Sequence, residues 1–172
     1  SQPFSHIHRP GIAVGGHCIP VYPRLYLSTD KDATVVREAR KFNATMPEYC
    51  VKQLANLLGD LSGLKVAVLG ASYRGGVKET AFSGVFATVD ALRERNAAVV
   101  VHDPMYTASE ISDFGWDSYQ LGEPVDAVIV QADHEEYKSI SPEDFPGIKA
   151  IFDGRRITDA DKWNGTPRLT IG

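Results

Sequence analysis

The sequence is poor in cysteine, in net positive charge and in long apolar runs, and each shortage excludes a class of protein. Two cysteines among 172 residues are too few for a disulfide framework, which favours a reducing, cytoplasmic location. A formal net charge of −4 leaves no electrostatic footprint for nucleic acid, so we exclude that partner. No apolar run approaches the roughly 20 residues that cross a bilayer, and no signal-peptide pattern opens the chain.

The sequence also lacks an initiator methionine and reaches its first glycine pair by residue 16. We therefore predict that it is part of a longer protein. Its 43% hydrophobic and 23% charged residues are typical of an ordinary globular domain. A chain of this length can bury one good core and carry an appendage.

The most informative stretch is residues 9–22, RPGIAVGGHCIPVY, which contains Cys18. Gly15 and Gly16 carry no side chains, so another molecule could approach the backbone beside this cysteine. His17 is adjacent in sequence, and a neighbouring imidazolium can activate a thiol. The residues alone leave two interpretations open, a reactive thiol or a small buried side chain in a turn.

Residues 1–30 are rich in Pro, His, Gly and Tyr and show no helical periodicity, which predicts a loop-rich segment. Its histidines and cysteine invite a zinc hypothesis, because these are the ligands that zinc prefers: His6, His8, His17 and Cys18. Their spacing matches no ordinary structural zinc pattern, and no second cysteine lies nearby. We therefore predict no metal.

Residues 32–61 repeat apolar side chains at steps of three and four, which predicts a helical stripe facing the core. Pro47 must interrupt or kink this pattern, so we expect two helices or one kinked helix. Thr45 and Glu48 have the spacing of a capping box for a second helix. The stripe consists of Val35, Ala39, Phe42, Met46, Cys50, Leu54, Leu57 and Leu61, and we expect Cys50 to be packed rather than reactive.

After residue 63 short β-branched runs alternate with amphipathic stretches, which predicts an α/β domain with a parallel sheet. The expected strands are residues 65–69, 98–101, 125–131, 149–152 and 169–171. The expected helices are residues 82–95 and 107–114, with a short turn or helix at 141–145. The dinucleotide fingerprint G-x-G-x-x-G fails, because Gly70 is followed by Gly75-Gly76 and Asp103 lies 33 residues past Gly70. A nucleotide can still bind at the carboxyl ends of the strands.

Three stretches, GGHCIPVYPRLYL, KVAVLGASYRGGVKET with VVVHDPM, and IFDGRRI, resemble in this order the motifs of the UDP-glucose/GDP-mannose dehydrogenase family. The resemblance implies a cysteine loop and a central helical segment over residues 1–62, with a homodimer formed through residues 32–61. It implies a Rossmann-like UDP-binding domain over residues 63–172. The NAD-binding N-terminal domain of the family would lie outside this chain, so we predict that the chain alone is inactive.

The same resemblance implies the chemistry and the residues that carry it. Family members oxidise the C6 alcohol of a nucleotide sugar to a carboxylate with two NAD, through a thioester on the cysteine. Cys18 would be this nucleophile, and Lys78 would extend toward NAD. The predicted substrate-binding residues are Arg9, Gly15, Gly16, Tyr73, Arg74 and Arg155.

The chain departs from the family pattern at three positions. Tyr22 stands where many members have an aspartate, and we assign it no catalytic role because a phenol is a poor base near pH 7. Arg74 and Lys78 exchange the usual lysine and arginine, which differ in geometry. These departures support a rival interpretation, a noncatalytic nucleotide-binding or dimerisation module.

The histidine before Cys18 resembles the bacterial UDP-N-acetylmannosamine and UDP-N-acetylglucosamine members of the family. We therefore predict UDP-N-acetylmannosamine as substrate, with UDP-glucose and GDP-mannose as the alternatives.

Overall fold

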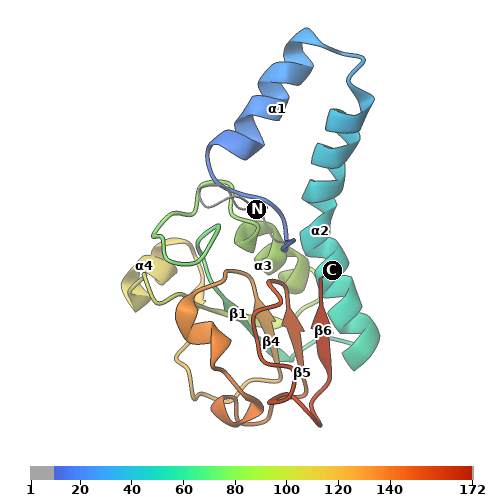
Figure 1. Ribbon diagram of the computed structural model, residues 1–172. Helices are drawn as coiled ribbons and strands as arrows, with labels where there is room; N and C mark the ends of the chain where they lie inside the picture. The colour runs from blue at the N-terminus through green and yellow to red at the C-terminus, as the bar shows by residue number, and fades with distance from the viewer. Residues whose placement is uncertain (1–9, 172) are drawn as a thin grey trace.

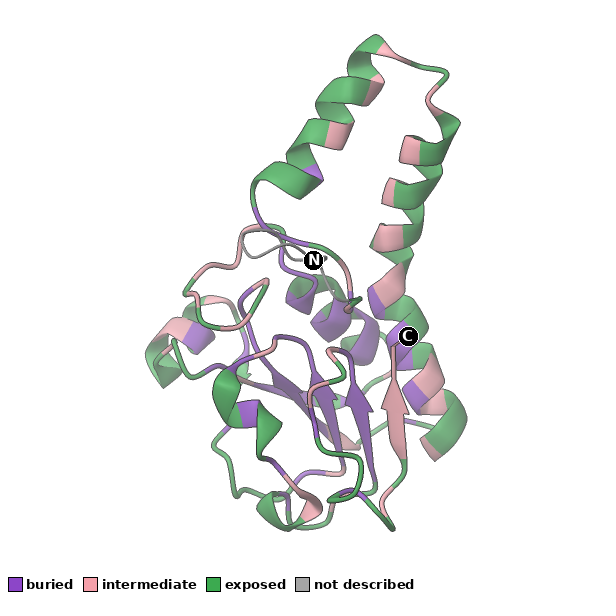
Figure 2. Cartoon of the chain, viewed as in Figure 1, coloured by how far each residue is buried: buried purple, intermediate pink, exposed green. Residues whose placement is uncertain are grey.

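The computed structural model describes residues 10–171 and consists of an α/β body with a helical arm (Figure 1). The arm is formed by α1 (Cys18–Thr29) and the first half of α2 (Thr34–Leu58), which run side by side away from the body. Most of its surface is exposed, whereas the central strands of the sheet in the body are buried (Figure 2). Within residues 10–171, no helix is both long and apolar enough to span a membrane.

The first helix corrects the prediction that residues 1–30 are loop-rich, because residues 18–29 are helical. Pro20 lies in the first turn, where a backbone N–H has no helical partner to lose. Pro23 is accommodated inside the helix. The helix ends at Asp30, whose N–H donates to the carbonyl of Tyr26 and whose carboxylate accepts the Tyr26 hydroxyl at 2.8 Å. Pro20 and Pro23 are the reason that the sequence predicted a loop here and not a helix.

The second helix is continuous over 25 residues, with Pro47 inside it. A restarted helix capped by Thr45 and Glu48 is therefore wrong. The Thr45 hydroxyl donates to the carbonyl of Phe42 at 2.8 Å, and Glu48 pairs with Arg95 on α3.

Only part of the second half of the predicted stripe on α2 reaches the core, since Leu57 is 40% exposed. Cys50 and Leu54 are fully buried, which confirms that Cys50 is packed. Val35 and Phe42, in the arm, are 84% and 68% exposed. The prediction of a core-facing stripe is thus wrong for the first half of α2, because the arm leaves the sheet behind.

The body is built on a six-stranded parallel sheet in the order β3-β2-β1-β4-β5-β6, which confirms the predicted Rossmann-like fold. The strands are β1 (Lys65–Leu69), β2 (Ala98–His102), β3 (Asp117–Ser118), β4 (Ala127–Val130), β5 (Ala150–Asp153) and β6 (Arg168–Thr170). Each of the five predicted strands is present within two residues of its expected bounds. The sequence did not reveal β3, which has only two residues.

Alternate residues of the strands enter two hydrophobic cores, one on each face of the sheet. One core packs against α2 and α3 (Val85–Arg93), and includes Val66, Val68, Ile129 and Phe152. The other is covered by loops and by η1 (Glu135–Lys138) and η2 (Pro142–Asp144), and includes Leu69, Val128, Tyr137 and Phe145. The short helix α4 (Ala108–Asp113) flanks β3 and begins with a capping box between Thr107 and Glu110.

The position of a ligand site follows from the strand order. The chain proceeds from β1 to β2 on one side and from β4 to β5 on the other, so the loops after β1 and β4 diverge. Open α/β sheets bind their ligands at such a switch point. The two loops begin in close contact, because a Cβ added to Gly70, which has φ 108°, would lie 2.4 Å from the Ala132 Cβ.

Candidate functional site

The segment of residues 11–17, here called the cysteine segment, lies across the carboxyl ends of β1, β4 and β5. Ile12 is 1% exposed, and its carbonyl accepts a hydrogen bond from the Gln131 side-chain amide at 2.8 Å. A Cβ added to Gly154 would lie 2.4 Å from the Ile12 side chain, and one added to Gly84 would lie 2.5 Å from the Ile12 carbonyl oxygen. These glycines allow the segment to lie directly on the loops after the strands.

The glycine pair brings the cysteine segment against the loop of residues 70–84. The Gly16 N–H donates to the Ala81 carbonyl at 2.8 Å. A Cβ on Gly15 would lie 2.7 Å from the Tyr73 Cβ, and one on Gly16, whose φ is 89°, would lie 3.1 Å from the Tyr73 ring. The structure therefore brings three of the predicted site residues, Gly15, Gly16 and Tyr73, into contact.

Cys18 is exposed and is the first residue of α1. The preceding His17 lies 3.1 Å from Glu79, measured from Nε2 to Oε2. The hydrogen bond from the Ala81 N–H, and then that from His17, hold the pKa of Glu79 below its usual value. The residue beside the thiol is thus tied to the same loop that carries Tyr73. Cys50 differs sharply, because burial raises the pKa of its thiol to about 12.

The two basic residues of the 70–84 loop have different surroundings. Arg74 is exposed, with its guanidinium 5.9 Å from the centre of the Tyr73 ring. Lys78 pairs with Glu110 of α4 at 2.5 Å and lies over the Tyr106 ring. Lys78 and then the N–H of Thr107 lower the pKa of Glu110 to about 2. The role of Lys78 toward NAD stays a prediction.

Arg155 is held under the cysteine segment, with its side chain 15% exposed. Its Nη2 pairs with Asp133 at 3.0 Å, and its Nη1 lies 2.4 Å from where a Cβ on Gly11 would be. The buried Nε of Arg155 has no hydrogen-bond partner among residues 10–171. A buried donor left unpaired is costly, so an acceptor from a ligand would suit this position.

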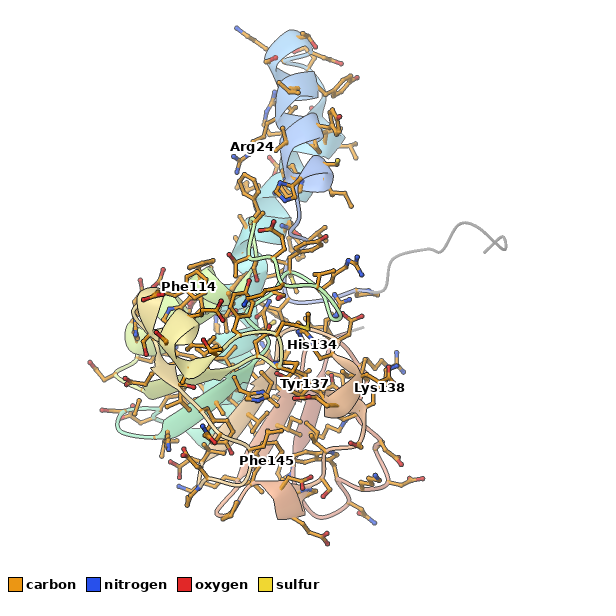
Figure 3. The ribbon with its side chains drawn as sticks, turned by 90° about the vertical axis from the view of Figure 1, so that its left-hand side faces the viewer. Arg24, Phe114, His134, Tyr137, Lys138 and Phe145 are labelled. Carbon is orange, nitrogen blue, oxygen red and sulfur yellow. The ribbon has the colours of Figure 1, made fainter. Side chains whose placement is uncertain are left out.

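Asp103, at the end of β2, occupies the place where dinucleotide-binding folds put the carboxylate that binds ribose. It is 2% exposed. Its Oδ2 accepts the N–H groups of Ala71 and Ser72 at 2.8 and 3.0 Å and lies 3.1 Å from the His134 Nε2. Figure 3 shows His134 beside Tyr137, and their ring centres are 5.5 Å apart.

The other oxygen of Asp103, Oδ1, accepts the Met105 N–H at 2.9 Å, so both oxygens of this buried carboxylate are engaged and it is not available to a ribose. Burial raises its pKa, but the hydrogen bonds outweigh burial and the net direction is downward. The residues at this edge of the sheet therefore do not fit NAD in the Rossmann manner, in agreement with the missing fingerprint.

Some predicted residues lie elsewhere. Arg9, His6 and His8 fall outside the described residues. Tyr22 is on α1 and is 64% exposed. From residue 10 to residue 171, no three His, Cys, Asp or Glu side chains are grouped so that they could hold a metal ion.

Sequence reasoning missed the polar residues that hold the site together: Glu79, Gln131, Asp133 and His134. The last three follow β4 directly, in the run Gln-Ala-Asp-His. Polar residues immediately after a buried strand stand at the ligand-binding edge of a parallel sheet. That signal was present in the sequence.

Comparison with known proteins agrees with this geometry. The sequence model of the UDP-glucose/GDP-mannose dehydrogenase family, UDP binding domain, matches residues 67–160. The chain belongs to this family. Among its curated relatives, the UDP-N-acetyl-D-mannosamine dehydrogenase of Methanococcus vannielii is 32% identical over 94% of this chain, and that of Pyrococcus horikoshii is 35% identical over 91%.

Solved structures give the same relation for this family member. The UDP-D-ManNAc dehydrogenase from Pyrococcus horikoshii superposes with a TM-score of 0.82 at 31% identity, covering 98% of this chain and 41% of that one. The UDP-N-acetyl-mannosamine dehydrogenase of Staphylococcus aureus has a TM-score of 0.74 at 27% identity, covering 98% of this chain and 40% of that one. The chain spans 39% and 38% of the two curated relatives, about two fifths of their length.

Proposed function

We propose that this chain is the C-terminal part of a nucleotide-sugar 6-dehydrogenase that acts on UDP-N-acetylmannosamine. One observation carries the proposal: the cysteine segment lies on the strand ends and contacts the loops that hold Tyr73 and Arg155. A nucleotide sugar bound by these loops would have its sugar near the cysteine segment, which leads directly into Cys18. The choice of N-acetylmannosamine as the sugar rests on the names of the relatives.

The C6 alcohol would first lose a hydride to the hydride acceptor and a proton to solvent, which gives an aldehyde. The Cys18 thiolate would attack the carbonyl carbon of this aldehyde, and protonation of the oxygen would give a thiohemiacetal. Transfer of a second hydride from that carbon to a second acceptor, with loss of the hydroxyl proton, would leave a thioester. Water then adds to the thioester carbonyl, the C–S bond breaks, and the products are a carboxylate and the free thiol. The exposed position of Cys18 gives a substrate access to the sulfur.

We assign roles in binding and positioning the substrate to residues of this chain. Arg155 and Arg74 would neutralise the diphosphate, since guanidinium groups form charge-assisted hydrogen bonds with phosphate. Gly15 and Gly16 would act indirectly, because their missing side chains let Tyr73 pack against the cysteine segment beside the sugar. Oxidation requires NAD as hydride acceptor, which a domain outside this chain would hold, because the residues around Asp103 do not fit it. The chain alone is therefore expected to be inactive, and the full enzyme to be cytoplasmic.

Calorimetric titration of this chain with UDP, GDP and UDP-N-acetylmannosamine tests the nucleotide site. We expect saturable binding of UDP that exceeds binding of GDP. Arg155→Ala is expected to weaken UDP binding about 10- to 100-fold, the range for hydrogen bonds to a charged group. Arg156→Ala, one residue along, is the matched control. Equal weakening by both substitutions would contradict the role of Arg155.

Alkylation tests the rival interpretation, a noncatalytic module. A nucleophilic Cys18 reacts rapidly with iodoacetamide, with a rate that rises with pH as the thiolate forms. It would be protected when UDP-N-acetylmannosamine is bound, and less protected by UDP. A thiol that reacts no faster than the cysteine of an unstructured peptide, and that UDP-N-acetylmannosamine does not protect, would favour the noncatalytic module.

We also propose that the arm forms a homodimer with a second copy of the chain. Val35 and Phe42 line an open apolar groove of about 1010 Å³ between the arm and the body. Large contiguous patches of exposed apolar side chains are uncommon on the surface of monomeric proteins, and they often mark an interface. Further exposed apolar residues of the two helices are Ile19, Val21, Tyr22, Leu25, Tyr26, Tyr49 and Leu57.

Sedimentation velocity of this chain tests the dimer. We expect a concentration-dependent dimer that Val35→Asp with Phe42→Asp disrupts. Asn56→Asp, at an exposed polar position of the same helix that does not line the groove, should leave it intact. A monomer at all concentrations would contradict dimerisation through this chain alone.

A further inference from the structure

Asp133, directly after β4, joins two loops through one carboxylate. Its Oδ1 accepts the N–H of Gly75 at 2.9 Å, in the loop after β1. Its Oδ2 accepts from the Nη2 of Arg155 at 3.0 Å, in the loop after β5. A side chain that bonds to both loops fixes the spacing between them.

The loops around Asp133 are packed closely against one another. A Cβ on Gly75 would lie 2.1 Å from the Asp133 carbonyl oxygen and 2.6 Å from the His134 nitrogen, so the two backbones are in direct contact. His134 adds a second, longer contact, from the N–H of Gly76 to its Nδ1 at 3.4 Å. On the other side, the guanidinium of Arg155 is confined beneath Gly11.

The negative charge of Asp133 is balanced by the positive charge of Arg155. Burial raises the pKa of Asp133, but the Gly75 N–H and the Arg155 guanidinium outweigh burial and hold the pKa below its usual value. An ionised carboxylate that faces a guanidinium makes short, directional hydrogen bonds. Asp133 would repel a phosphate that came into contact with it, so its effect on an anionic ligand must act through Arg155.

We propose that Asp133 is a positioning residue for the nucleotide diphosphate: it holds the Arg155 guanidinium at a fixed place beside the loop that carries Tyr73 and Arg74. This inference rests on the proposed function, because it assumes that Arg155 binds the diphosphate. Asp133 pre-orders the arginine before the ligand arrives, which lowers the entropy lost on binding.

The same strand offers a matched control at its other end. Asp126, just before β4, also combines a backbone hydrogen bond with an ion pair, to the Lys65 N–H at 2.8 Å and to Lys149 at 2.9 Å. Asp126 lies at the amino ends of the strands, whereas the cysteine segment lies at their carboxyl ends. Asp126→Asn therefore removes a similar set of contacts without touching the proposed site.

Calorimetric titration with UDP compares the wild-type chain with Asp133→Asn, which keeps an acceptor for the Gly75 N–H and loses the charge. We expect Asp133→Asn to weaken UDP binding at least 10-fold and Asp126→Asn to change it less than twofold. In the Arg155→Ala background, Asp133→Asn should have no further effect, since the residue acts through the arginine. Unchanged UDP binding, or an effect that persists without Arg155, would overturn the proposal.

A second measurement does not depend on nucleotide binding. In ¹⁵N NMR spectra, a restrained guanidinium gives separate Nη signals, and we expect these for Arg155 in the wild-type chain and in Asp126→Asn. In Asp133→Asn they should merge as the group rotates freely, and separate signals in that variant would overturn the positioning role. If the wild-type chain bound no nucleotide, the proposed function would fail, while wild-type binding that Asp133→Asn leaves unaltered would overturn only the role of Asp133.

Discussion

The hydrogen bond from Gln131 to Ile12 should control how firmly the cysteine segment is attached to the body. Gln131 is 5% exposed and uses both ends of its amide. Its Nε2 donates to the Ile12 carbonyl at 2.8 Å, and its Oε1 accepts from the Thr88 hydroxyl at 2.9 Å. Gln131→Met keeps the size of the side chain and removes both bonds.

The magnitude follows from the groups that lose their partners. Each buried hydrogen bond contributes about 1 kcal/mol net, and leaving the Ile12 carbonyl buried without a donor costs about 1–3 kcal/mol. The Thr88 hydroxyl retains the Gly84 carbonyl as an acceptor at 3.0 Å, which limits the damage there. We expect the cysteine segment to be less stable by about 1–3 kcal/mol, or roughly 5- to 150-fold in its opening equilibrium.

Native-state hydrogen exchange of the Gly16 amide measures this opening, because Gly16 donates to Ala81 only while the segment is attached. We expect Gln131→Met to accelerate exchange of Gly16 by that factor, more than it accelerates exchange of a core amide such as Val68. Thr88→Val is the matched control, since it removes a hydroxyl from the same cluster and leaves the bond to Ile12 in place. Equal exchange of Gly16 in the two variants would refute the reasoning.

Three further predictions test other parts of the structure. Iodoacetamide should label the exposed Cys18 in the folded chain and leave Cys50, whose thiol pKa burial raises to about 12, unlabelled until urea unfolds it; mass spectrometry decides. Burial lowers the pKa of His102, so the unfolded chain takes up this proton first; the free energy of unfolding should fall as the pH drops below about 6.5, and His102→Gln should flatten that slope in urea titrations. Gly75→Ala should lower the midpoint of thermal unfolding by several degrees, because its Cβ would meet the Asp133 backbone at 2.1 Å, whereas a midpoint equal to that of wild type would show that the loop yields.

The sheet was largely predictable from the sequence, since buried parallel strands appear as short β-branched runs between polar loops. The runs at 65–69 and 98–101 correspond to β1 and β2 almost residue for residue. The two-residue strand β3 has no such run, because it adds only a short edge to the sheet. Periodicity also predicted α2, but it did not indicate which half of the helix would face a core.

The site was predictable only in part, because a sequence motif indicates which side chains are reactive or charged but not which loops contact one another. The motif around Cys18 and the arginine at position 155 could be singled out from the sequence, and their roles stay predictions. The contacts of Arg155 with Gly11 and Asp133 depend on three loops that meet only when the sheet has formed. α1 was missed for a local reason: a proline in the first turn of a helix looks like a proline in a loop.

The bond between Gln131 and Ile12 spans 119 positions of the chain, and this separation sets the order of events during synthesis. Ribosomes deliver the N-terminal end first, so the cysteine segment emerges long before its amide partner exists. Closing such a long loop is unfavourable until the strands between its ends have paired. Cys18 is thus made well before the residues that order the segment beside it, and a nascent chain that stops before β4 carries this thiol without its contacts to the body.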